Sequence, residues 1–82
     1  MRYHVELKPK AEKDLKTLSG KDRLLVVERL RMLEDDVGGD VKRLTNHFPE
    51  YRMRAGTWRA LFEVAGDCVI VYRILHRREA YR

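Results

Sequence analysis

The stretch Tyr51–Val64, YRMRAGTWRALFEV, decides the expected fold, because two alternating segments meet there at a Gly-Thr pair. Successive side chains of a β-strand point to opposite faces, so Arg52 and Arg54 share one face of the first segment. The alternation resumes beyond Gly56, with Arg59 on the polar face of the second segment. Two antiparallel strands folded back at the glycine would bring the three arginines together on one face of a sheet.

The same patterns extend through the second half of the chain. Three strands are predicted there, at Tyr51–Ala55, Trp58–Val64 and Cys68 to about His76, and a short extended piece precedes them at Val41–Leu44. The last two strands are joined by the sequence AGD, which is a glycine-containing hairpin signal. The third strand contains CVIVYRIL, an almost continuously apolar run that is typical of a central strand.

The first half of the chain predicts one strand and two helices. The segment RYHVELK alternates apolar and polar residues, which indicates an edge or half-buried strand. A first helix is expected from Pro9 to Leu18 and a second from about Asp22 to Asp36, each with apolar residues at helical spacing. The two glycines at 38 and 39 end the second helix. Two closely linked amphipathic helices must bury their apolar stripes on the sheet, so we expect a two-layer α+β fold.

Size and composition allow a single domain over residues 1–82. Hydrophobic residues make up 44% of the chain, and 18 Lys and Arg against 13 Asp and Glu give a net charge of +5, which favours an anionic partner. Cys68 is the single cysteine, which excludes an intramolecular disulfide and a cysteine framework for zinc. No run of apolar residues reaches the ~18 of a membrane span, and we expect a cytoplasmic protein without a metal site.

The C-terminal tail HRREAYR adds further cations to the arginines of the strands. The face that the helices leave uncovered is expected to form a basic groove with Tyr81 at its rim, and Arg73 and Arg78 are candidate RNA-binding residues beside it. Arginine suits such a groove because its planar guanidinium binds phosphate oxygens bidentately and stacks on bases. An aromatic side chain beside a basic groove can stack on an unpaired base.

The simpler interpretation of any one of these arginines is a solvated residue on the wet face of an antiparallel sheet. Several like charges on neighbouring strands repel one another, however, so a cluster indicates an anionic ligand or a counter-charge. The methionines at 32 and 53 are expected to fill the core. His4 and His47 are isolated, and no spacing of ligands predicts a metal site.

The order of these elements and several segments resemble the RelE/ParE superfamily of bacterial and archaeal type II toxins. The resemblance rests on AEKDLKTL, VKRL, YRMRAGTWRALFEV and VYRILHRREAY, and the paired patterns YRxRxGxxR and HRxxxY are its most specific part. It implies a RelE-like fold and an antitoxin partner. In the RelE branch it also implies a ribosome-dependent endoribonuclease that cleaves mRNA in the A site through the adjacent 2′-hydroxyl, with no metal or other cofactor. The functional positions of the family fall here on Arg52, Arg54, Arg59, Arg77 and Tyr81.

Two of these positions carry arginine where well-studied relatives carry lysine, namely Arg52 and Arg54. Arginine stabilises a developing phosphorane charge, but its pKa above ~12 prevents it from accepting a proton. The residues that remain for proton transfer are His76, which titrates in the useful range, and Tyr81, whose phenol nearby cations would acidify. The sequence leaves both alternatives open.

Two other functions compete with the nuclease. The ParE branch of the superfamily shares the fold but poisons DNA gyrase, and its members generally lack the full set of basic residues and the terminal tyrosine. A non-catalytic module that binds an antitoxin or RNA without cleavage is the third possibility. The filled set of arginine and tyrosine positions favours the nuclease.

Overall fold

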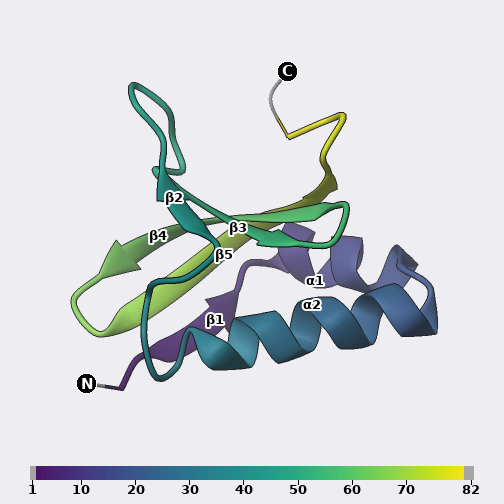
Figure 1. Cartoon of the computed structure of the whole chain (residues 1–82), viewed down its shortest axis with the longest axis horizontal. Coiled ribbons are helices and arrows are strands. Elements are labelled where there is room, and N and C mark those ends of the chain that lie inside the picture. The colour runs from purple at the N-terminus through teal and green to yellow at the C-terminus, as the bar shows by residue number, and fades with distance from the viewer. Residues whose placement is uncertain (1, 81–82) are drawn as a thin grey trace.

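A computed structural model describes residues 2–80, which form a five-stranded sheet and two helices (Figure 1). In chain order the elements are β1 (His4–Leu7), α1 (Pro9–Thr17), α2 (Gly20–Met32), β2 (Val41–Arg43), β3 (Tyr51–Ala55), β4 (Trp58–Ala65) and β5 (Cys68–His76). Neither helix is long and apolar enough to cross a membrane. Both helices lie on one side of the sheet, so the predicted two-layer α+β fold is confirmed.

The strand order is β1-β5-β4-β3-β2, and the four strands from β2 to β5 form an antiparallel meander. The N-terminal strand β1 pairs with β5 in parallel, and Val5 lies opposite Val69. A parallel pair needs a crossover connection, which here is the helical hairpin together with the meander. As predicted, β1 is an edge strand and β5 lies inside the sheet.

The second helix differs from its expected bounds at both ends. It begins at Gly20 rather than Asp22, because Ser19 caps it and the Ser19 hydroxyl accepts a hydrogen bond from the Asp22 amide. It ends at Met32 rather than Asp36. The last turn tightens there, since the amides after the helix bond to carbonyls three residues back, and the chain leaves helical geometry before the two glycines.

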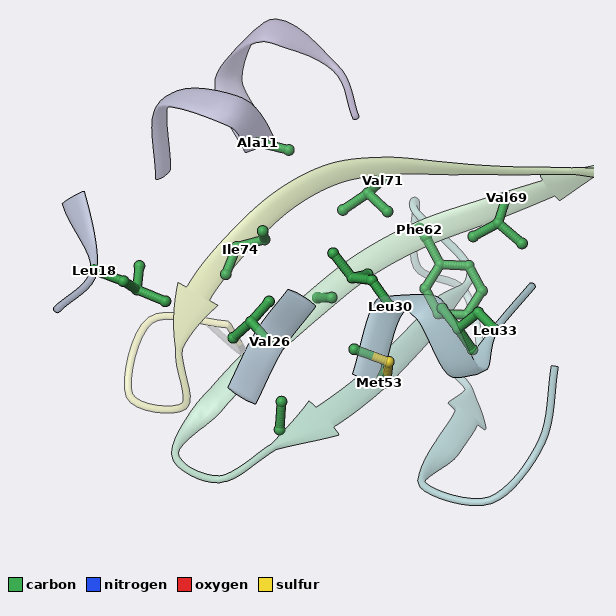
Figure 2. Close-up of a cluster of buried hydrophobic side chains, with 12 residues drawn as sticks. Ala11, Leu18, Val26, Leu30, Leu33, Met53, Phe62, Val69, Val71 and Ile74 are labelled. Atoms are coloured by element: carbon green, nitrogen blue, oxygen red, sulfur yellow. The ribbon is translucent and has the colours of Figure 1, made fainter. Parts of the chain in front are cut away.

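The hydrophobic core fills the space between the helices and the sheet (Figure 2). Phe62 and the other inward residues of β4 and β5 face Val26 and Leu30 of α2 and Leu33, the C-cap residue of that helix. Met53 is buried as predicted, but Met32 is 62% exposed, so the prediction that it fills the core was wrong. Residue 32 lies off the stripe of positions 26, 30 and 33, and the helix turns it toward solvent.

Candidate RNA-binding face

The face of the sheet that the helices do not cover, called the open face below, carries the predicted arginines. In the pairing of β3 with β4, Arg54 lies directly opposite Arg59, and Arg52 lies opposite Leu61. The hairpin turn at Gly56 has the positive φ of 63° that the tight reversal needs. The expectation that these three arginines share one face is confirmed. Two guanidinium-bearing residues in direct cross-strand register repel each other, so the arrangement favours a bound anion or a counter-charge.

Arg59 is held rigidly in the hairpin. It is only 9% exposed, and its Nη1 atom donates to the carbonyl oxygens of Gly56 at 2.9 Å and Trp58 at 2.8 Å. Its Nε atom is buried and makes no hydrogen bond within residues 2–80. A charged donor that is buried and unsatisfied costs free energy. Arg59 is therefore a cation that the hairpin holds in a fixed position on the open face.

The counter-charge of Arg54 is Asp40. Its Oδ1 atom lies 3.3 Å from Nη2 of Arg54, and its Oδ2 atom accepts from Nη1 of Arg29 at 2.8 Å. Hydrogen bonds from Arg29 and then Arg54 hold the pKa of Asp40 below its usual value. An anionic ligand that binds Arg54 must compete with this carboxylate.

One cation of the open face was not singled out from the sequence. Lys42 of β2 is the cross-strand partner of Arg52, and it is exposed on the same face. The neighbouring Val41 lies opposite the buried Met53, so the alternation within VKR could have revealed that residue 42 points outward. The open face thus carries cations on three adjacent strands.

A β-bulge changes the faces of β5 partway along the strand. The register shifts between Leu61 and Phe62, so that Phe62 faces Val71 whereas Leu61 faces Arg73. Val71 and Ile74 are both buried in the core, and the two residues between them must therefore point away from it. Tyr72 and Arg73 consequently both project from the open face or the sheet edge.

Arg73 is bound within the protein. Its Nε and Nη2 atoms donate to the carboxylate of Asp14 on α1 at 2.7 and 3.2 Å, and the Ile74 amide donates to the same carboxylate at 3.0 Å. Asp14 raises the pKa of Arg73 above its ordinary value. The contact lies where β5 extends beyond its partner β1, so Asp14 satisfies an otherwise open strand edge. Arg73 stays a candidate RNA-binding residue, but RNA would have to compete with this carboxylate.

His76 and Arg77 lie on different sides of the sheet. His76 is paired with Trp58, and the two rings meet edge to face at 5.5 Å on the same face as the buried Ala60. The Arg77 amide donates to the Thr57 carbonyl at 2.8 Å, so the strand alternation continues and turns the Arg77 side chain to the opposite, open face.

The tail after β5 turns away from the sheet. The Nδ1 atom of His76 accepts from the Arg78 amide at 3.3 Å, and both Arg77 and Arg78 are exposed. Tyr81 lies outside the described residues. The structure therefore brings Arg52, Arg54, Arg59 and Arg77 to one face and places the imidazole of His76 on the other.

The loop from residue 44 to 50 stands at the opposite end of the open face from the tail, and both rise on the side away from the helices (Figure 1). A polar depression of 440 Å³ in this loop is lined by Arg43, Leu44, Thr45, Asn46, His47 and Glu50, and it contains none of the clustered arginines. Within residues 2–80, no three His, Cys, Asp or Glu side chains lie together as metal ligands would.

Comparisons with known proteins agree on one family. Residues 5–81 match the family model described as ParE toxin of the type II toxin–antitoxin system parDE. The chain is 35% identical over 74 residues to Toxin RelE3 of Methanocaldococcus jannaschii, with 84% of each protein covered.

Solved structures give the same result. The RelBE2 toxin–antitoxin complex from Mycobacterium tuberculosis matches with a TM-score of 0.81 and 26% identity, over 94% of this chain and 100% of that one. The RelB–RelE antitoxin–toxin complex from Methanococcus jannaschii matches with a TM-score of 0.74 and 28% identity, over 92% and 93% of the two chains.

Proposed function

We propose, from the premise that this chain belongs to the RelE/ParE superfamily and is a type II toxin, that it is a ribosome-dependent endoribonuclease. It would cleave mRNA at codons in the ribosomal A site and so inhibit translation, which places it in the cytoplasm. The observation that carries the proposal is the cross-strand cluster of Arg52, Arg54 and Arg59 on the face that the helices leave uncovered. The named relative at 35% identity is a RelE toxin, which supports the nuclease branch.

The proposed reaction is attack of a 2′-hydroxyl on the adjacent phosphorus. The new P–O bond forms as the bond to the leaving 5′-oxygen breaks, which yields a 2′,3′-cyclic phosphate and a 5′-hydroxyl. Negative charge accumulates on the non-bridging phosphate oxygens in the transition state, where fixed cations are most effective. Arg59 would supply the rigid contact, while Arg54 would exchange its ion pair with Asp40 for a contact with the phosphate. Arg52 and Arg77 would hold the flanking backbone.

Proton transfer in this mechanism is assigned to Tyr81 or His76. The position of His76 beside Trp58, on the face opposite Arg59, favours Tyr81 for this role. Positive charge around a phenol stabilises its phenolate form and so would acidify Tyr81. Tyr81→Phe should therefore slow cleavage more than His76→Gln. Equal rates for both variants and the wild-type chain would contradict the assignment to either residue.

We also propose an antitoxin as the protein partner, because the solved relatives are toxin–antitoxin complexes. An open face with arginines on adjacent strands suits an acidic or amphipathic segment that folds as it binds. Such a segment could neutralise the toxin by pairing with Arg52 and Arg54, by displacing the tail that carries Tyr81, or by its bulk alone.

The experiment that tests the proposed function is cell-free translation with the purified chain, followed by primer extension on the mRNA. Arg54→Ala and Arg77→Ala should each slow cleavage by about 10²- to 10³-fold, as expected when a transition-state contact is removed. Arg31→Ala is the matched control, because it removes an equal charge from an exposed position on α2. Addition of EDTA to a reconstituted step with preformed ribosome complexes, at constant free magnesium, tests whether cleavage needs a more tightly chelated metal such as zinc or manganese.

Gyrase inhibition is the second candidate, because the matching family model is described as a ParE toxin. Intact mRNA in the presence of active ribosomes and the wild-type chain would refute the nuclease. A supercoiling assay with purified gyrase would then separate the ParE activity from a module that only binds its antitoxin. Loss of supercoiling at toxin concentrations that leave mRNA intact would establish the ParE activity.

A further inference from the structure

Phe48 is an aromatic residue that the proposed mechanism does not use and that the fold leaves in solvent. It is 68% exposed, whereas the other large exposed apolar residues within residues 2–80, Leu24 and Met32, lie on α2. Phe48 belongs instead to the loop that stands at one end of the open face. An exposed phenyl ring beside a row of cations requires an explanation other than packing.

The loop that carries Phe48 is fixed against the open face. Glu63 follows the buried Phe62 on β4 and so points to the open face, where its carboxylate accepts a hydrogen bond from the Glu50 amide. The Leu44 amide donates to the Glu50 carbonyl at 2.6 Å, which closes the base of the loop. These contacts join the loop to the sheet and define where its aromatic residue lies.

Tyr72 packs against the ring of Phe48. Tyr72 follows the buried Val71 and so points to the open side of β5, and its ring centroid lies 5.2 Å from that of Phe48 at an angle of 70°. This edge-to-face geometry is a favourable one for aromatic pairs and orients the ring of Phe48. The Lys8 ammonium lies 5.8 Å from the Tyr72 centroid and adds one cation beside the aromatic pair.

The aromatic pair adjoins the arginine cluster. Tyr72 precedes Arg73, which lies opposite Leu61, and Leu61 in turn lies opposite Arg52. Neighbouring strands are ~4.8 Å apart, so about 10 Å separates the backbone of β5 at the bulge from that of Arg52. A polynucleotide whose phosphate is held by the arginines can therefore reach Phe48 with a nearby base.

We propose that Phe48, supported by Tyr72, is a stacking platform for one unpaired base of the RNA, next to the phosphate held by the arginines. The inference rests on the proposed function and adds a second stacking contact to the one expected of Tyr81 at the rim of the basic groove. Every base has a π face, so such a platform holds the strand in register without reading a sequence. The arginines of the open face attract a polyanion to this side of the sheet.

The experiment measures mRNA cleavage on programmed ribosomes while an abasic nucleotide is moved through the A-site codon and its neighbours. For the wild-type chain, one abasic position outside the base assigned to Tyr81 should slow cleavage by about 5- to 100-fold, the effect of one lost stack. In Phe48→Ala cleavage should already be slowed by that factor, and the same abasic position should add little. Phe48→Trp should restore the base dependence, whereas Phe48→Leu should not.

Met32→Ala is the matched control, since it removes another exposed apolar side chain, on the helical side, and should change neither rate nor base dependence. Equal sensitivity of wild-type and Phe48→Ala chains to every abasic position would refute the platform while leaving the nuclease intact. Absence of cleavage by the wild-type chain would refute the proposed function, and the platform with it. Normal cleavage by Phe48→Ala, together with weakened antitoxin binding, would assign the ring to the protein partner and refute the RNA platform.

Discussion

Replacing Asp14 by alanine should destabilise this protein more than any other single change to an exposed or half-buried charged residue of α1. Ala11 is the buried apolar residue of this nine-residue helix, and Leu15 and the C-cap residue Leu18 also pack in or against the core. The Asp14 carboxylate also accepts two hydrogen bonds from Arg73 and one from the Ile74 amide, across nearly sixty residues of sequence. Asp14→Ala removes all three contacts at once.

The expected loss can be worked out from these contacts. A hydrogen bond between a buried backbone amide and a charged acceptor contributes about 1.5–3 kcal/mol, and losing it leaves the Ile74 amide unsatisfied. The Arg73 side chain is 39% exposed and can be rehydrated, so its ion pair adds only about 0.2–1 kcal/mol. Asp14→Ala should therefore lower the free energy of unfolding by about 2–4 kcal/mol. For a domain of this size the Tm should fall by about 10–25 °C.

The assay is urea and thermal unfolding followed by circular dichroism. Asp14→Asn is the informative second variant, because its amide oxygen still accepts from the Ile74 amide, and it should lose about half as much stability. In an Arg73→Ala background the cost of Asp14→Ala should shrink by no more than the ion-pair contribution. A loss below about 0.5 kcal/mol for Asp14→Ala, or equal losses for the alanine and asparagine variants, would show that the amide contact does not hold α1 to β5.

Two further predictions concern the counter-charge and the hairpin turn. Hydrogen bonds from Arg29 and then Arg54 lower the pKa of Asp40 below its ordinary 3.8. The ionised Asp40 therefore stabilises the fold fully above pH 3.8, and this contribution is lost as the pH falls through the lowered pKa of the folded state. Denaturant unfolding across the acid range should show a steeper decline for the wild-type chain than for Asp40→Asn, and parallel curves would contradict this. Gly56→Ala should lower the free energy of unfolding by about 1–2 kcal/mol because of the positive φ. The loss should exceed that of Gly66→Ala, because of the two only Gly56 would bring the new Cβ to 3.0 Å from a leucine methyl of α2. Equal losses for the two alanine variants in thermal unfolding would show that this crowding is relieved without cost.

The arginines of the candidate site could be assigned to a face from the sequence, but their partners could not. Alternation on either side of Gly56 was sufficient to place Arg54 beside Arg59. Nothing in the local pattern indicated that Asp40 would pair with Arg54, or that Arg59 would be nine-tenths buried. The first depends on where the loop before β2 brings Asp40, and the second on how closely the β3–β4 hairpin surrounds the Arg59 side chain.

The position of His76 shows why simple alternation of side chains does not predict the faces along the whole of a long strand. Counting by two along β5 from the buried Val71 would place His76 outward, whereas the bulge adds one residue and turns it to the side of Ile74 and Trp58. A bulge is set by the fit between two strands and has no reliable signature in either one alone. Tyr72 follows Val71 directly, so it points outward with or without the bulge and meets the loop that carries Phe48.

The sequence by itself determined the type and order of the elements, because helical and strand periods, glycine turns and helix caps act over a few residues. It therefore predicted β3, β4 and β5 almost to the residue, together with the two-layer arrangement that their apolar faces require. The tertiary structure alone decided that β1 pairs with β5 in parallel, that Asp14 binds Arg73, and that Phe48 lies on Tyr72. Each of these contacts joins residues more than twenty positions apart, and such contacts form only when the whole chain has packed.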